Sequence, residues 1–184
     1  MYLLFNFAVL SFLLNIVAVN GTGQSRLSDK ELLAAAREII IKARFGTLIT
    51  HGHDGQLQAR TIDPFEPEEQ MVVWFATNPR TRKVMEMTRD SPVTLYFFDR
   101  EDLAYVTLKG RARLVNDAQE KQKRWKEEWK EFYPNRDRDY LLVKVTPLKI
   151  EVVNTAKGIL GNPRTWRPPT VRFISRQKIK SFAQ

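Results

Sequence analysis

Cysteine is absent from the 184 residues, and histidine occurs only as His51 and His53. The first absence excludes disulfide bonds, thiolate metal centres and cysteine nucleophiles. A metal centre built on two histidines would need carboxylates to complete it, and a solvated turn is the simpler interpretation of this pair. Gly-x-Ser-x-Gly, Walker and His-Glu-x-x-His patterns are also missing. None of these common catalytic motifs therefore indicates a function.

Charged residues are missing from positions 1–25, whereas positions 155–184 hold seven basic residues and no acidic one. All 21 acidic residues lie in the body, 26–154, so the net charge of +9 is largely a property of the tail. A basic tail favours anionic ligands, but this one lacks a groove-reading motif, and we expect no nucleic-acid partner. We therefore divide the chain into a hydrophobic leader (1–25), a folded body (26–154) and a basic, proline-containing arm (155–184).

The leader is apolar over positions 2–19 except for Asn6, Ser11 and Asn15, and small or polar residues follow. This length favours a secretory signal peptide over a spanning helix, which needs about 20 uninterrupted apolar residues. The usual basic start of such a peptide is missing, so an anchoring helix or a misplaced start remain alternatives. A real leader implies an exported or periplasmic protein without a stable membrane span after its removal. Otherwise we expect a cytoplasmic protein.

Hydrophobic periodicity in the body predicts a mainly β protein with flanking helices. The capping box Ser28-Asp29-Lys30-Glu31 begins a helix that runs to about Arg44. Asp54-Gly55 predicts a hairpin between strands 45–50 and 56–62. We expect four further strands, at 71–76, 93–98, 103–115 and 140–153, and helices at 81–89 and 117–132. Six antiparallel strands in this order imply a small closed or partly closed barrel.

One segment has the features of a phosphate site. Residues 75–83 end a buried strand and open a helix, where free amides and the helix dipole attract anions. Hydroxyls and positive charges in this segment come from Thr77, Thr81, Arg82 and Lys83. Upstream, Arg60 stands in an otherwise uncharged strand, as an anion ligand or as a solvated outer-face residue. Together these residues predict a site for a dianion flanked by apolar strand, which flavin mononucleotide (FMN) requires.

The same segment resembles the F-Y-T-N-x-x-S-R-K stretch of the pyridoxamine 5′-phosphate oxidase family, the FMN-binding split barrels. Arg60-Thr61-Ile62 falls where that family has its R-x-V strand motif, and residues 93–97 and 106–112 are similar to its next two strands. Residues 125–134 and 141–151 look more like its general stress protein branch. The resemblance covers about 27–153. It implies a six-stranded antiparallel split β-barrel that binds FMN at the interface of a homodimer.

The resemblance also implies roles for particular residues. Arg60, Arg82 and Lys83 would hold the FMN phosphate, with Thr81 at the helix opening. The backbone of Thr61 and Ile62 would meet the isoalloxazine ring. The ribityl–phosphate side would be lined by Ala76 and Thr77.

Three departures from the oxidase argue against vitamin B6 phosphate oxidation. Phe65 replaces a lysine that serves the substrate phosphate, and Tyr105 aligns with a glutamine that touches the flavin. The oxidase's C-terminal Trp and Arg motif is not recognisable, although Trp166 in the proline-rich arm could cover a ligand pocket instead. The alternative for Trp166 is that it pins the arm to the barrel.

We therefore expect an FMN-binding flavoprotein, a flavin-dependent oxidoreductase whose substrate and electron donor the sequence does not reveal. No residue stands out as a catalytic acid or base. None is required, because the cofactor would perform the electron transfer. One alternative is a flavin-binding module without turnover, related to stress responses. Another is a basic protein that binds polyanions through 155–184.

Overall fold

The computed structural model describes residues 27–173. The expected leader, 1–25, and the last part of the basic arm lie outside the described residues. Within 27–173, no helix combines the length and apolar character that crossing a membrane requires.

The first helix, α1 (Asp29–Ala43), begins at the predicted capping box. The Ser28 hydroxyl accepts a hydrogen bond from the Glu31 amide, and the Glu31 carboxylate accepts one from the Ser28 amide at 2.8 Å. Residues three and four apart on one face are buried against the sheet: Leu32, Ala35, Ala36, Ile39 and Ile40. The predicted amphipathic helix is confirmed.

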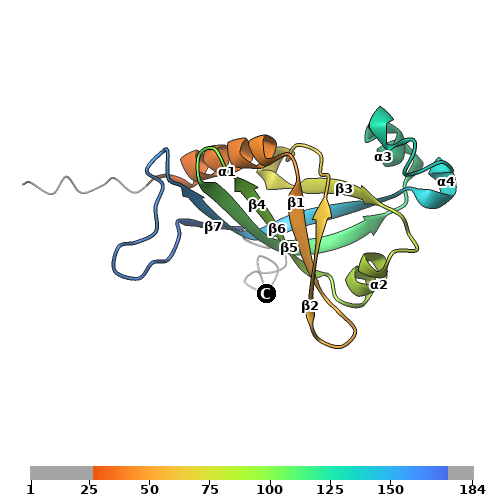
Figure 1. Ribbon diagram of the computed structural model, residues 1–184, viewed down its shortest axis with the longest axis horizontal. Coiled ribbons are helices and arrows are strands. Elements are labelled where there is room, and N and C mark those ends of the chain that lie inside the picture. The colour runs from red at the N-terminus through yellow and green to blue at the C-terminus, as the bar shows by residue number, and fades with distance from the viewer. Residues whose placement is uncertain (1–26, 174–184) are drawn as a thin grey trace, which may run out of the picture.

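Seven antiparallel strands form one sheet, and six of them make the curled half-barrel that the sequence predicts (Figure 1). Along the sheet the order is β2-β1-β4-β5-β6-β3, and β7 pairs with β6. The strands are β1 (Gly46–His51), β2 (Leu57–Ile62), β3 (Val73–Thr77), β4 (Pro92–Asp99), β5 (Ala104–Val115), β6 (Leu141–Asn154) and β7 (Thr170–Arg172). Side chains alternate between the core and the outer surface along β4 and β5, as a sheet with one covered face requires.

The barrel is split between its two edge strands, β2 and β3. Just after β2 the chain approaches β3, where Pro64 forms an isolated bridge with Phe75 and the Phe65 amide donates to the Trp74 carbonyl at 2.8 Å. Upstream of that bridge β2 pairs only with β1. Helix α2 (Arg82–Arg89) follows β3 and sends its side chains to β1 and β2. This helix therefore links the two sides of the split.

At Gly110 on β5, the backbone of the neighbouring strand β6 approaches closely. The pairing register of β5 and β6 shifts between Lys109 and Gly110, and Gly110 pairs with Pro147. A Cβ atom at position 110 would lie 2.5 Å from the Thr146 carbonyl oxygen, so glycine is required there. Pro147 thus lies at a bulge within the continuous strand β6.

The predicted helix 117–132 is wrong. The chain is helical only in α3 (Ala118–Lys123) and leaves helical geometry at Arg124, with φ −116° and ψ 82°. The Arg124 guanidinium lies 3.8 Å from the Trp74 ring centroid and pairs with Glu68, and its backbone carbonyl accepts the Tyr140 hydroxyl hydrogen bond. These tertiary contacts replace the helical conformation that local propensity favours.

The segment after Arg124 forms a short 3-10 turn, η2 (Glu127–Trp129), and a single helical turn, α4 (Arg136–Asp139). Trp125 and Trp129 pack with Tyr133 and Tyr140 in a separate aromatic cluster. A continuous helix over 117–132 would place Phe132 on the same face as Trp125 and Trp129, but Phe132 is 72% exposed. The segment therefore has no helical face that these three side chains share.

The basic arm contains one strand that the sequence did not predict. Val171 on β7 pairs with Ile150 on β6 and is buried. Between β6 and β7 the chain forms a surface loop, and another 3-10 turn, η1 (Glu69–Met71), precedes β3.

Candidate functional site

The Arg60 side chain on β2 points toward helix α2. Its side chain is 17% exposed and donates to Glu86 Oε2 at 2.7 Å, to the Gln58 carbonyl at 3.0 Å and to the Thr50 hydroxyl. The alternative of a solvated outer-face arginine is therefore excluded. Strands β1 and β2 and helix α2 each contribute a partner, so the position of this guanidinium is fixed by the fold.

Glu86 is the centre of this cluster, and sequence reasoning missed it. Its side chain is 4% exposed, accepts a hydrogen bond from the Thr50 hydroxyl at 2.6 Å, and lies with Oε1 3.1 Å from Arg82 Nε. Burial alone would raise the pKa of Glu86. The hydrogen bonds from Thr50 and Arg60 and the charges of Arg60 and Arg82 outweigh burial, so the pKa lies below its ordinary value. The carboxylate is therefore ionised at neutral pH.

Lys83 is a half-buried cation that no carboxylate neutralises within the described residues. Its ammonium donates to the Thr77 hydroxyl at 3.1 Å. Burial is the largest cause that lowers the pKa of Lys83, and the positive charge of Arg60 lowers it further, against the opposing charge of Glu86. The lowered pKa therefore reflects burial first and the neighbouring charge of Arg60 second.

The start of α2 adds unpaired backbone amides to these charges. Thr81 is the N-cap residue, but its hydroxyl makes no capping bond and donates to the Asn78 carbonyl at 2.8 Å. It also lies 3.1 Å from the Thr77 hydroxyl. In the described part of the chain, the amides of Arg82 and Lys83 have no hydrogen-bond acceptor. Such a helix start is suited to an anion.

The charges of the cluster add up to a match for a phosphate monoester. Three cations, Arg60, Arg82 and Lys83, surround one carboxylate, Glu86, which leaves two positive charges. A phosphate monoester carries close to two negative charges at neutral pH. The cluster therefore combines charge, hydroxyl groups and free amides of the kind that a phosphate needs.

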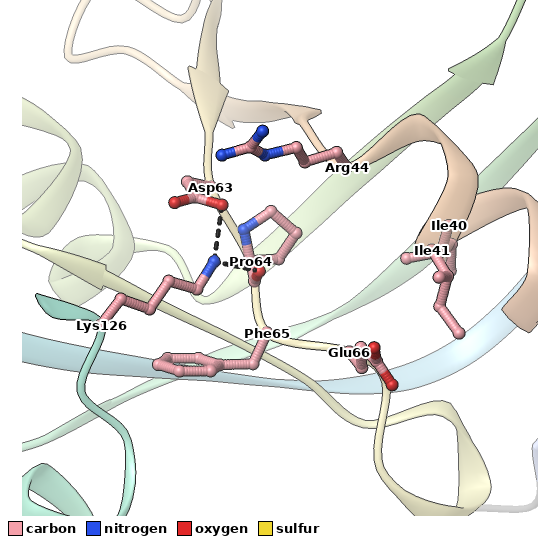
Figure 2. Close-up of a pocket in the computed structure, with 8 residues that line it drawn as sticks. All are labelled: Ile40, Ile41, Arg44, Asp63, Pro64, Phe65, Glu66 and Lys126. Carbon is pink, nitrogen blue, oxygen red and sulfur yellow. Dashed lines mark hydrogen bonds and ion pairs between the residues drawn. The ribbon is translucent and has the colours of Figure 1, made fainter. Parts of the chain in front are cut away.

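Two cavities lie on either side of this cluster along β2. One, of about 380 Å³, adjoins the hairpin between β1 and β2 and is lined by Gly52, His53, Asp54, Gln58, Arg82, Met85, Glu86 and Arg89. The other, of about 290 Å³, adjoins the chain just after β2 and is drawn in Figure 2. It is lined by Ile40, Ile41, Arg44, Asp63, Pro64, Phe65, Glu66 and Lys126.

The structure brings together five of the predicted site residues: Arg60, Thr77, Thr81, Arg82 and Lys83. Two others continue β2 toward the second cavity, with Thr61 exposed and Ile62 buried in the core. Ala76 is half-buried and directly precedes Thr77 on β3.

Tyr105 and Trp166 lie apart from the cluster in this chain. Tyr105 is on β5, separated from β2 by β1 and β4, and its ring centroid is 5.9 Å from that of Tyr96. Trp166 is 85% exposed in the loop between β6 and β7, which lies at the opposite end of the molecule from α2 (Figure 1). Their contact with a cofactor stays a prediction that would require a second chain.

The two histidines do not form a metal site with their neighbours. His51 Nδ1 lies 3.2 Å from an Asp90 carboxylate oxygen at the surface. Residues 27–173 contain no group of three or more potential metal ligands.

Comparison with known proteins identifies relatives in sequence and in fold. Residues 31–162 match the sequence model of the family described as "Pyridoxamine 5′-phosphate oxidase like". A solved structure of a protein related to general stress protein 26, from Clostridium acetobutylicum, is 20% identical with a TM-score of 0.64. The match covers 83% of this chain and 99% of that one.

General stress protein 26 from Bacillus anthracis is 22% identical with a TM-score of 0.62, over 78% of this chain and 99% of its own. A pyridoxamine 5′-phosphate oxidase-related, FMN-binding protein from Nostoc punctiforme is 13% identical with a TM-score of 0.56, over 81% and 98% of the two chains. No curated protein sequence matches the chain. At these identities, the likeness to solved structures shows a common fold.

Proposed function

The chain belongs to the pyridoxamine 5′-phosphate oxidase-like family, and we propose that it binds FMN non-covalently as a homodimer and carries out a redox step at the flavin. The observation that carries this proposal is the convergence of two uncompensated positive charges with the free amides at the start of α2. A dianionic phosphate would complete the hydrogen bonds of this cluster and neutralise its charge.

Arg60, Arg82 and Lys83 would hold the phosphate, with Thr81 at the helix opening and Thr77 beside it on β3. Glu86 would orient the two arginines, because it already pairs with both at distances of 2.7 and 3.1 Å. The arrangement is therefore preorganised and needs little side-chain ordering when the ligand arrives.

The ring of the cofactor would lie along β2 beyond Arg60. β2 is an edge strand, and along it every second residue turns its backbone amide and carbonyl away from β1, so one of Thr61 and Ile62 presents these groups at the open edge. A flavin ring carries donors and acceptors along one edge, which such a backbone edge can pair with. When bound, the flavin supplies electron transfer, and the chain supplies position and exclusion of water.

A second copy of the chain would cover this edge. Leu57 on β2 and Met85 on α2 are 66% and 64% exposed although both are apolar, and they flank the cation cluster. Exposed apolar side chains beside a site are typical of an interface. A homodimer would bury them and close the flavin from solvent.

The experiment is to purify the protein and record its visible spectrum. We expect flavin absorption bands, and we expect Arg82→Ala and Lys83→Ala proteins to elute with less flavin. Arg113→Ala, which removes an exposed cation on β5, is the charge-matched control and should retain the cofactor. A colourless protein that cannot be reconstituted with FMN would refute the proposal.

Reduction of the bound flavin then separates an enzyme from a binding module. Reduction by NAD(P)H or another donor, followed by reoxidation, would support an oxidoreductase. A flavin that binds tightly but accepts no electrons from any donor would make the protein a flavin-binding module, as in the alternative drawn from the sequence.

A further inference from the structure

The cavity after β2 has an apolar floor and a charged rim (Figure 2). Ile40 and Ile41 at the end of α1 form one wall, and Pro64 and Phe65 form the floor. A volume of about 290 Å³ is near the lower end for ligand pockets, so it suits a small molecule.

Arg44 enters this cavity from a strained turn. Its backbone has φ 58° and ψ −53°, and the Phe45 amide donates to the Ala43 carbonyl at 2.6 Å across it. This geometry is the positive-φ form of the γ-turn, which is rare and strained for any residue other than glycine. A strained arginine on a cavity wall therefore indicates a role for its side chain.

The guanidinium of Arg44 has no carboxylate or carbonyl partner among residues 27–173. Its one side-chain contact there is with the Phe45 ring, whose centroid is 5.1 Å away. Arg37, seven residues earlier on α1, is by contrast an arginine whose guanidinium is engaged in the fold. It donates to the carbonyls of Pro67 and Glu68, the latter at 2.6 Å, and fixes the loop after β2. Arg37 is thus structural, whereas the donors of Arg44 are free.

The carboxylate of Asp63, which also lines the cavity, already accepts a hydrogen bond on each oxygen. Asp63 accepts from Lys126 at 2.7 Å and from the Trp129 indole at 2.9 Å, one bond on each oxygen. Lys126 also donates to the Pro64 carbonyl at 3.1 Å, and its third N–H remains for a ligand. Figure 2 shows the Arg44 guanidinium extending toward Asp63, with the Lys126 ammonium on the other side of that carboxylate and Phe65 beyond it.

We propose that this cavity binds a small organic carboxylate with an apolar body. The carboxylate accepts hydrogen bonds from Arg44 and Lys126, and the body packs on Phe65, Pro64 and Ile40. Asp63 directly follows Thr61 and Ile62, so the ligand lies beside the position assigned to the flavin ring. The binding site stands without the flavin, whereas the assignment of this carboxylate as the redox substrate rests on the proposed function.

The test compares 2-naphthoate with 2-naphthamide, which has the same shape without the charge. Titration calorimetry of the full protein should show millimolar or tighter binding of the carboxylate and weaker binding of the amide. Arg44→Gly should weaken naphthoate binding by about tenfold or more, the loss expected for one charge-assisted interaction. Arg113→Ala, which removes an exposed arginine on β5, should change nothing.

Arg44→Gly also separates a binding role from a structural one. Glycine adopts positive φ without strain, so the melting temperature should stay level or rise while the ligand is lost. Glu66→Gln, which removes the free carboxylate at the cavity rim, should tighten naphthoate binding. Equal affinity for acid and amide, or unchanged affinity in Arg44→Gly, would overturn the proposal.

The visible spectrum of the flavin distinguishes failure of the carboxylate site from failure of the proposed function. If the protein holds flavin, naphthoate should perturb its visible spectrum in the wild type and not in Arg44→Gly. Arg44-dependent binding of naphthoate to a protein that takes up no flavin would leave the carboxylate site standing and refute the substrate role. Flavin binding without Arg44-dependent naphthoate binding would refute the carboxylate site and leave the proposed flavin function standing.

Discussion

In the proposed FMN site, selective binding of the phosphate should depend most directly on Lys83, because its ammonium pairs with no carboxylate in the described chain. Lys83→Met removes that charge at similar size. We expect FMN affinity to fall by about tenfold to a hundredfold, the loss of one charge-assisted hydrogen bond, and affinity for riboflavin, which lacks the phosphate, to stay constant. Titration of apoprotein by flavin fluorescence measures both. An equal loss for the two flavins would place Lys83 away from the phosphate.

If Lys83 holds the FMN phosphate as proposed, its lowered pKa should give FMN binding a pH dependence. Burial and the charge of Arg60 favour the neutral amine, so the free protein loses this charge at a pH below the ordinary 10.5. FMN affinity should therefore decrease as the pH rises through that lowered pKa. Riboflavin affinity should not follow the same curve, and Lys83→Met should abolish the pH-dependent part. A flat profile for wild-type FMN binding over this range would contradict the expectation.

Glu86 gives the fold itself a dependence on acid pH. Its pKa is lowered in the folded protein, so its contribution to stability is fully present above the unfolded-state value near 4.5 and is lost as the pH falls through the folded value. Urea denaturation at pH 7 should show Glu86→Gln less stable by about 3 kcal/mol, because Arg60 then stays half-buried without its counterion. As the pH falls from 5 through the folded-state pKa of Glu86, the free energy of unfolding should decrease less for Glu86→Gln than for the wild type. Glu101→Gln, on an exposed turn, serves as the control.

At the residue scale the sequence predicted the cations of the site better than its acid. Arg60 was recognisable because it interrupts an uncharged strand, and Arg82 and Lys83 because they follow a strand end. Glu86 stands four residues after Arg82, the spacing of an ordinary surface ion pair on a helix, and nothing in that pattern shows that its side chain is buried. Its role arises from Thr50 and Arg60, which only the folded sheet brings to it.

Among the elements, those with strong local signals matched their predictions closely. The capping box fixed the start of α1, and the alternation of apolar residues located the strands to within one or two residues. The failure came at 117–132, where charged residues of high helix propensity surround two tryptophans. The buried Arg124, stacked on Trp74 and paired with Glu68, breaks the helix through contacts between residues about 50 apart in sequence. Local patterns carry no information about such contacts.

The break in that segment leads to a test of side-chain burial. Trp129 is buried, and its indole donates to Asp63, whereas Phe132 is exposed. Trp129→Ala should lower the free energy of unfolding by about 3 to 5 kcal/mol, the cost of removing a large buried side chain. Phe132→Ala should change it by less than about 0.5 kcal/mol. Urea titrations of both variants measure these values, and similar losses for the two would favour the continuous helix.

For the whole molecule, the sequence predicted a closed or partly closed barrel of six strands, and the structure is the partly closed form, with the strand order β2-β1-β4-β5-β6-β3. The place of the split could not be predicted, because it depends on where the chain just after β2 meets β3, at Pro64 and Phe75. That meeting point leaves the upstream part of β2 open, with the cation cluster beside it. The open edge is what makes a second chain part of the proposed site.

The proposed homodimer would complete the flavin site, so loss of assembly should also cause loss of the flavin. Leu57→Asn and Met85→Gln together replace the apolar side chains beside the open edge of β2 with polar ones of similar size. Polar side chains at these positions gain no hydrophobic free energy when a second chain buries them. We therefore expect the double variant to sediment as a monomer and to lose most of its FMN affinity at the same time. Phe132→Asn, at another exposed apolar position, should leave both properties intact. Analytical ultracentrifugation with absorbance at protein and flavin wavelengths measures mass and cofactor in one experiment. A monomer that retains full flavin content would show that one chain binds FMN unaided, since loss of the partner then costs the site nothing.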